Sequence, residues 1–212
     1  MNELLFVAGD STGVLIFMGA ATSFILGIGL TVTAAYVFLA IVLAPALIDG
    51  GLMPMAVHLF ILYWGMLSFI TPPVALGAFA AASIAGANPV ATGFEAMRLG
   101  VAIYLVPFLF VLNPALIGVG PWQGIVQAAL EALLGVLLIA WSAQRYLPRL
   151  GDPGFIAACL LGFGGLLVAL PEINLEGVAL SNFDGNLAGI LMIVLALLLA
   201  RVRANPAPKT AS

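Results

Sequence analysis

Charge is scarce in this sequence. Only 7% of the residues are charged, 64% are hydrophobic, and the mean hydropathy is +1.24. Ordinary globular domains are roughly 45–50% apolar and about 25% charged. This composition excludes a soluble domain, because there is too little polar surface to cover the apolar side chains. The sequence therefore predicts an all-α, polytopic integral membrane protein.

Cysteine is nearly absent, and no removable leader is evident. Cys159 is the only cysteine, which excludes an internal disulfide and a cysteine-rich metal site, and we expect it to be small and buried. The opening stretch MNELLFVAGDST has no basic region and no small-residue cleavage site, so it does not predict a signal peptide. Targeting is expected to reside in the membrane segments.

Apolar runs divided by Gly, Pro, Asn and Asp mark the candidate membrane segments. A span of the hydrocarbon core takes about 20 helical residues, and several runs are shorter. Short runs favour a re-entrant hairpin over 13–48 and a broken helix over 53–86, which are tolerated where protein or a water-filled cavity shelters the backbone. The runs lie at residues 13–26, 33–48, 53–70, 74–86, 100–119, 124–143, 154–171 and 187–202.

The basic residues predict the orientation. All six basic residues lie on one side of the membrane under the following topology. Residues 13–48 enter the membrane and return to the same side, residues 53–86 cross it once, and each later run crosses it once. The positive-inside rule assigns that face to the cytoplasm, which leaves the N-terminus in the periplasm and the C-terminus, with a disordered tail at 204–212, in the cytoplasm. This sorting does not distinguish a short hairpin from two full spans over 13–48. The six basic residues are Arg98, Arg145, Arg149, Arg201, Arg203 and Lys209.

The stretch SFITPPVALG places two adjacent prolines inside an apolar segment. Because Pro72 and Pro73 have no amide hydrogen, the carbonyls of Ser68 and Phe69 lose their helical partners at membrane depth. The hydroxyls of Ser68 and Thr71 lie beside those carbonyls. The resulting cluster of oxygen atoms suits a hard cation such as Na⁺.

Beyond the prolines, a new helix is expected to begin at about Val74. Its free amides and positive dipole end favour an anionic group. The break therefore provides oxygen ligands for a cation and free helix amides for an anion. A kink repaired by Ser and Thr side chains and by neighbouring helices is an equally weighted alternative.

A second interruption lies in FILGIGLTVTAAY, at the tip of the predicted hairpin. Gly27 and Gly29 permit backbone geometries closed to other residues, while Thr31 and Thr33 add hydroxyls. A glycine-rich kink or close helix packing is the alternative interpretation of the glycines. Two interrupted segments close together in one chain point to a transporter site.

Three stretches resemble a known family. They are SFILGIGLTVTAAYVFLAIVLAPAL, SFITPPVALGAFAAASIAGANP and GFEAMRLGVAIYLVPFLFVLNPAL. They closely resemble the DctM-like large membrane subunit of tripartite ATP-independent periplasmic (TRAP) transporters, particularly the fused permeases that work with TAXI-type binding proteins. The resemblance covers roughly residues 10–120. The family commonly has a proline where this chain has Thr31.

The resemblance implies a sodium-coupled, elevator-type importer in the bacterial inner membrane. Its expected partners are a periplasmic solute-binding protein that delivers a carboxylate substrate, a small membrane subunit and the lipid bilayer, with no nucleic acid. No cofactor is expected beyond Na⁺ as the coupling ion. By motif match, the sodium and substrate sites fall on Gly27, Gly29, Thr31 and Thr33 at the hairpin tip, and on Ser68, Thr71, Pro72, Pro73 and Val74 at the break.

The resemblance also implies a domain organisation. Residues 1–120 correspond to the second transport repeat, with the hairpin at 13–48, the broken helix at 53–86 and a helix at 100–119, and 121–203 correspond to C-terminal transmembrane helices. Family members are several times longer and contain an earlier inverted repeat. The chain is therefore expected to be a truncated or split product that works with a missing N-terminal half. The alternative function is a non-transporting remnant or assembly module that packs against other membrane subunits.

The remaining polar residues point to structural roles. Arg98 is expected to pair with Glu95 at three-residue spacing. His58 is expected to be hydrogen-bonded rather than a metal ligand. Glu131 is a functional candidate because it lies in a membrane segment, although solvation near an interface is the favoured interpretation. A lone histidine and cysteine leave no catalytic constellation, so we do not expect an enzyme.

Overall fold

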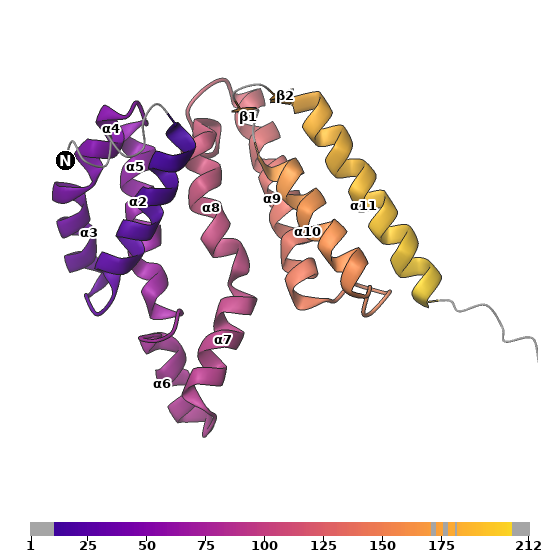
Figure 1. The fold of residues 1–212 in the computed structure, drawn as a ribbon, viewed down its shortest axis with the longest axis horizontal. Helices are drawn as coiled ribbons and strands as arrows, with labels where there is room; N and C mark the ends of the chain where they lie inside the picture. The colour runs from indigo at the N-terminus through magenta and orange to yellow at the C-terminus, as the bar shows by residue number, and fades with distance from the viewer. Residues whose placement is uncertain (1–10, 171–172, 176–177, 181, 205–212) are drawn as a thin grey trace, which may run out of the picture. The chain divides into compact units, whose positions relative to one another are not determined.

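The fold is described from a computed structural model of residues 11–170, 173–175, 178–180 and 182–204. The predicted all-α class is confirmed (Figure 1). Among the described residues, the other regular elements are two short antiparallel strands, β1 (Ile173–Leu175) and β2 (Val178–Leu180). The chain divides into two compact units, residues 1–120 and 121–212. Most of the predicted tail lies outside the described residues.

The first unit begins with a helical hairpin packed on a third helix. The hairpin is formed by α2 (Thr12–Gly27) and by α3 (Val32–Val42) with α4 (Ala44–Asp49), and α5 (Pro54–Met66) packs against all three. Buried apolar side chains from all four helices form one cluster, so the hairpin and α5 form one packed body. The largest fully buried side chains among them are Leu39, Leu43, Leu47, Phe60 and Ile61.

The helix breaks where the two prolines were predicted to break it. After α5, a 3₁₀ turn η1 (Leu67–Phe69) leads into an irregular segment, and α6 (Leu76–Ala85) then begins. The peptide bond between Pro72 and Pro73 is cis. The new helix starts two residues later than the predicted Val74, because Ala75 adopts a left-handed conformation, with φ of 34°, and precedes the first helical residue.

One helix was missed from the sequence. Helix α7 (Pro89–Leu99) precedes α8 (Val101–Leu112), with a bend of 42° between them, and a 3₁₀ turn η2 (Pro114–Ile117) follows. Figure 1 shows α6 and α7 side by side, extending past the tip of the α2–α3 hairpin. Polar residues interrupt the apolar pattern of α7, which explains why the helix was not predicted. Its first turn nevertheless has a recognisable sequence signal, because Asn88 accepts from the Ala91 amide at 3.0 Å and Pro89 follows.

The predicted ion pair on α7 is confirmed. The Arg98 guanidinium lies 3.3 Å from the Glu95 carboxylate, and both side chains are about half exposed. Exposed pairs of this kind add little to stability, since water and salt screen them. The pair therefore marks a polar patch on α7 rather than a site.

The second unit consists of long helices packed through small residues. It contains α9 (Trp122–Gln144), α10 (Phe155–Ala169) and α11 (Asn182–Ala204), and α10 packs against both others. A β-carbon on Gly135 would overlap the carbonyl of Gly165, and one on Gly164 would lie 2.9 Å from the Gly189 carbonyl oxygen. Close approach of this kind is typical of membrane helices. Cys159, which was expected to be buried, is only partly buried on α10.

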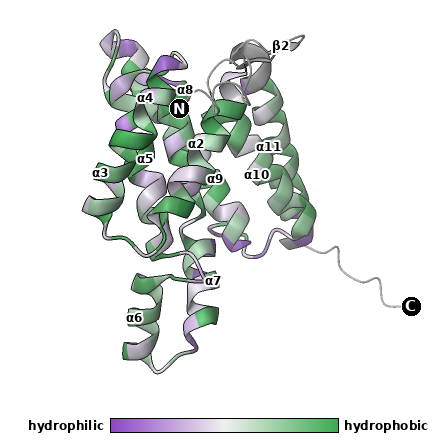
Figure 2. Cartoon of the chain, turned by 60° about the vertical axis from the view of Figure 1, so that its left-hand side comes forward, coloured by the Kyte–Doolittle hydropathy of each residue, from purple (hydrophilic) through white to green (hydrophobic). Residues whose placement is uncertain are grey.

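The helix lengths and the exposed surface fit a membrane protein. Within the described part of the chain, α9 and residues 186–203 of α11 are each long and apolar enough to cross a bilayer, and the bent pair α7–α8 is a third candidate. Figure 2 shows hydrophobic residues along most helices of both units. Large apolar side chains such as Ile84, Trp122 and Phe155 are more than 70% exposed. Such exposure is expected of side chains that face lipid.

Candidate functional site

The candidate site lies where the tip of the α2–α3 hairpin meets the break between α5 and α6. Ser68 joins the two interruptions. Its hydroxyl lies 3.0 Å from the carbonyl oxygen of Gly27 and 3.2 Å from that of Gly65, and its side chain is 2% exposed. The single hydroxyl hydrogen is shared between these two acceptors. Two segments that are separate in sequence, and that both lack regular helical bonding, thus meet at one buried hydroxyl.

Gly27 allows this approach because it has no side chain. A β-carbon built on Gly27 would overlap the carbonyl group of Gly65. Gly65 is itself covered, since a β-carbon there would lie 3.2 Å from Leu39 Cδ1. The two glycines therefore let the backbones of α2 and α5 touch, and any larger residue at Gly27 would separate the hairpin from the break.

Two helices end at this contact, and a carbonyl from the end of each helix accepts a hydrogen bond from Ser68. Gly27 is the last residue of α2, and Gly65 lies in the last turn of α5. Among the described residues, no backbone amide donates to the carbonyls of Ser68 and Phe69. Helix C-termini carry partial negative charge, and unpaired carbonyls add to it. The local field therefore favours a cation.

Thr71 connects the break to α8. Its hydroxyl donates to the Leu67 carbonyl at 2.7 Å and is also hydrogen-bonded to the phenol of Tyr104. The Tyr104 ring packs edge-on against Trp64 of α5, with 6.1 Å between ring centroids. Tyr104 was not predicted as part of the site. No local signal distinguishes it from the neighbouring apolar residues of α8, because its role comes from a contact with Thr71, 33 positions earlier.

The two prolines are enclosed on one side by α7. A β-carbon on Gly93 would lie 2.8 Å from Pro72 Cγ, so α7 lies directly against that ring. Pro73 is exposed, and Val74 is partly buried. Ala75, which precedes the first residue of α6, provides no side-chain cap for the first amides of this helix. The break is therefore packed against α7 and α8, and its new helix begins with amides that no side chain satisfies.

The hydroxyls near the break do not repair it. The sequence left open a kink in which Ser and Thr side chains and neighbouring helices satisfy the freed groups. Both hydroxyls are instead engaged with other carbonyls, those of Gly27, Gly65 and Leu67. A hydroxyl could not have satisfied the carbonyls of Ser68 and Phe69 while donating its only hydrogen elsewhere.

The rest of the hairpin tip is open. Gly29 has a φ of 78°, and a β-carbon there would meet nothing within 4 Å. Thr31 caps α3, accepting from the Ala34 amide at 3.3 Å, and both Thr31 and Thr33 are exposed. A threonine suits this position because its oxygen satisfies a free amide at the helix start. Of the predicted tip residues, the structure therefore brings Gly27 to the break and leaves Gly29, Thr31 and Thr33 on the surface.

Two buried polar atoms near the site lack partners. Ser23 Oγ, one turn before Gly27 on α2, and Trp64 Nε1, on α5, have no hydrogen-bond partner among the described residues. Ser23 is 0% exposed. Unsatisfied buried polar atoms are rare in native proteins, and each of them requires an explanation. The sequence did not single out either residue, because a serine or tryptophan in an apolar run is ordinary.

The predicted hydrogen bond of His58 is confirmed. His58 Nδ1 lies 3.2 Å from the Tyr36 hydroxyl, so this histidine is hydrogen-bonded between α3 and α5. Glu131 is partly exposed and accepts from Gln127 at 2.9 Å. In the part of the chain that the structure describes, His, Cys, Asp and Glu form no group of three or more that could hold a metal.

Comparison with known proteins identifies the family. The family model described as the tripartite ATP-independent periplasmic transporter, DctM component, matches residues 1–125, which include the whole first unit. No curated protein and no solved structure matches the chain. The match covers both the hairpin tip and the break, and the predicted resemblance is confirmed. The chain therefore belongs to the DctM family, the large membrane components of TRAP transporters.

Proposed function

We propose that this permease component couples sodium to the import of organic acids. Membership of the DctM family makes it a multi-pass component of a transporter of the bacterial inner membrane, in a family of transporters and not of enzymes. In our proposal the substrate is a carboxylate delivered by a periplasmic binding protein of the TAXI type. The rest of the permease and a small membrane subunit complete the transporter, and the C-terminus faces the cytoplasm.

The sodium proposal rests on the unpaired carbonyls at the break. A buried carbonyl without a donor costs about 1–3 kcal/mol. The carbonyls of Ser68 and Phe69 lack amide donors among the described residues, and the Ser68 hydroxyl donates to the carbonyls of Gly27 and Gly65 at the C-terminal ends of α2 and α5. A monovalent hard cation would satisfy these oxygens without an acidic ligand, as unwound helices do in other transporters.

The carboxylate proposal rests on the start of α6. No side chain caps the first amides of this helix, and a helix N-terminus favours an anion. The exposed tip residues Gly29, Thr31 and Thr33 are proposed to contribute once the other permease half is present. In this arrangement the cation and the substrate occupy opposite sides of one break, so each would favour binding of the other.

The decisive experiment restores the missing amides. Replacing Pro72 and Pro73 with alanine supplies donors for the carbonyls of Ser68 and Phe69, so we expect the sodium response to disappear while the fold persists. Thermal unfolding of the permease complex is measured in NaCl and in choline chloride, and uptake is measured in proteoliposomes with and without a sodium gradient. Pro107→Ala is the matched control, because it also adds an amide to an interior helical position.

The hydroxyls supply a second test. Thr71→Val removes a hydroxyl that bonds the carbonyl four residues earlier, as Thr92→Val does on α7, where the distance is 2.9 Å. We expect sodium-dependent uptake to fall only with Thr71→Val. Uptake and sodium stabilisation that survive Thr71→Val and both proline replacements would end the site assignment. Sodium stabilisation without any uptake by the reconstituted complex would instead favour an assembly module.

A further inference from the structure

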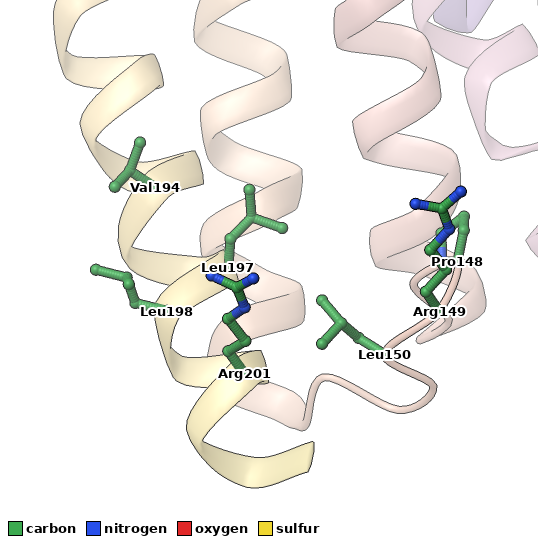
Figure 3. A pocket seen from close by; sticks show the side chains of 7 residues that line it. All are labelled: Pro148, Arg149, Leu150, Val194, Leu197, Leu198 and Arg201. Carbon is green, nitrogen blue, oxygen red and sulfur yellow. The ribbon is translucent and has the colours of Figure 1, made fainter. Parts of the chain in front are cut away.

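A pocket in the second unit combines two arginines with an apolar floor. It has a volume of about 400 Å³ and lies between the loop that follows α9 and the C-terminal half of α11. Figure 3 shows Arg149 and Arg201 on opposite sides of this pocket, with Leu150 between them. The remaining lining residues are Pro148, Val194, Leu197 and Leu198.

In the described part of the chain, no acidic side chain forms an ion pair with the arginines of the pocket. Asp152, the acidic residue of the loop, lies 3.5 Å from Arg145. Neither Arg149 nor Arg201 has an ion-pair partner among the described residues, and both side chains are exposed. Two arginines in such a position attract an anion, and their planar guanidinium groups match phosphate oxygens.

The loop holds Arg149 in place. Leu147 and Gly151 exchange two backbone hydrogen bonds, of 2.8 and 2.9 Å, which close the turn that carries Arg149. Leu147 is 2% exposed and packs in a cluster with Leu161 of α10 and Ala200 of α11. The backbone at Arg149 is therefore anchored to the helix that carries Arg201, so the spacing of the two arginines is built into the unit.

Exposed apolar side chains of α11 form the floor of the pocket. Val194, Leu197 and Leu198 are 48%, 38% and 55% exposed. A separate cavity of about 420 Å³ lies one to two turns toward the N-terminus of α11, and its lining is apolar except for Glu131 of α9 and Asn186 of α11. A small soluble anion would gain nothing from this surface. A molecule with a phosphate at one end and a long hydrocarbon chain would use both parts.

We propose that this pocket binds an anionic phospholipid. The head-group phosphate lies between Arg149 and Arg201, and an acyl chain lies on Val194, Leu197 and Leu198. Basic pockets between transmembrane helices at the cytoplasmic face are suited to such lipids. Lipid binding would tie the loop between α9 and α10 to α11. It is independent of the ion and substrate sites proposed for the first unit.

Native mass spectrometry of the full chain in detergent tests this proposal. The probes are phosphatidylglycerol, phosphatidylcholine and inorganic phosphate. We expect adducts with phosphatidylglycerol that the double variant Arg149→Gln/Arg201→Gln binds roughly 30-fold more weakly, since each arginine near an anionic surface contributes about 1 kcal/mol. Arg201→Gln alone should weaken binding about fivefold. Arg203→Gln is the matched control, because it removes the same charge from the same helix outside the pocket.

Each contrary outcome overturns the proposal. If phosphatidylcholine bound as tightly as phosphatidylglycerol, the charge of the arginines would play no role. If inorganic phosphate bound as tightly as phosphatidylglycerol, the apolar floor would play no role. If Arg203→Gln weakened phosphatidylglycerol binding as much as Arg201→Gln, the lipid would be attracted by the overall positive charge of α11 and not by the pocket. A double variant that changed the oligomeric mass and not the lipid adducts would identify a protein contact. Circular dichroism of each variant excludes loss of helices as the cause.

Discussion

Each unit of this protein joins two helices through a serine hydroxyl. In the first, Ser68 donates to the carbonyls of Gly27 and Gly65 at the ends of α2 and α5. In the second, Ser142 donates to the carbonyl of Ala158 at 2.7 Å, inside α10. The same group therefore serves different purposes. Inside α10 it adds a bond between complete helices, whereas at the break it lies among carbonyls that regular helix bonding does not satisfy.

The largest effect is expected from filling the closest helix contacts. Gly27→Ala and Gly135→Ala each place a methyl group onto a carbonyl of the facing helix, and overpacking of this kind costs about 1–3 kcal/mol. We expect both variants to unfold at lower temperature in detergent. Only Gly27→Ala should abolish sodium-dependent uptake, because it moves the hairpin from the break.

Gly13→Ala is the control for both glycine variants. Its β-carbon would meet only Ser11 Oγ at 3.9 Å, and an alanine in a helix is more stable than a glycine by up to about 1 kcal/mol. Loss of stability in this variant comparable to the other two would show that the helices respond to glycine replacement in general.

Replacing Ser68 and Ser142 compares the two units most directly, because each serine joins two helices by a hydrogen bond. Ser68→Ala and Ser142→Ala should each lower the free energy of unfolding by about 1–2 kcal/mol, because each removes a hydrogen bond between helices. Sodium stabilisation, measured as the difference in unfolding temperature between NaCl and choline chloride, should vanish for Ser68→Ala and persist for Ser142→Ala. Equal sodium stabilisation in the two variants would erase the functional distinction between the units.

A smaller effect is expected from a polar contact of the first unit that lies away from the break. Tyr36→Phe removes the hydroxyl that lies 3.2 Å from His58 Nδ1. The loss should be about 0.5–1.5 kcal/mol of unfolding free energy. Uptake should remain sodium-dependent, since α3 and α5 stay packed through their apolar residues. A loss of sodium dependence would extend the site to this pair.

The smallest effect is expected at an exposed ion pair of the second unit. Arg145 and Asp152 are 3.5 Å apart, and their side chains are about half exposed. Arg145→Gln should change the unfolding free energy by less than about 1 kcal/mol, and added salt should reduce the difference further. Unfolding temperatures at low and high salt measure this directly. A large effect, insensitive to salt, would show that the loop depends on this pair.

The break was readable from the sequence because it follows from covalent chemistry. Pro72 and Pro73 have no amide hydrogen in any fold, so the carbonyls that they would have satisfied had to find another partner or none. The long apolar run of α9 was readable for a similar reason, since its length alone matches a bilayer. Helix α7 was not predicted because Glu95 and Arg98 interrupt its apolar pattern, although its capping residues Asn88 and Pro89 are typical of a helix start.

The sequence by itself determined which backbone carbonyls lose their helical donors, because proline has no amide hydrogen in any fold, and which runs are long and apolar enough for a membrane. Only the tertiary structure decided which distant groups meet. Ser68 finds Gly27, 41 positions earlier, and Thr71 finds Tyr104, 33 positions later. Local preferences act over a few residues, whereas these contacts depend on how whole helices pack, which no single stretch of the chain specifies.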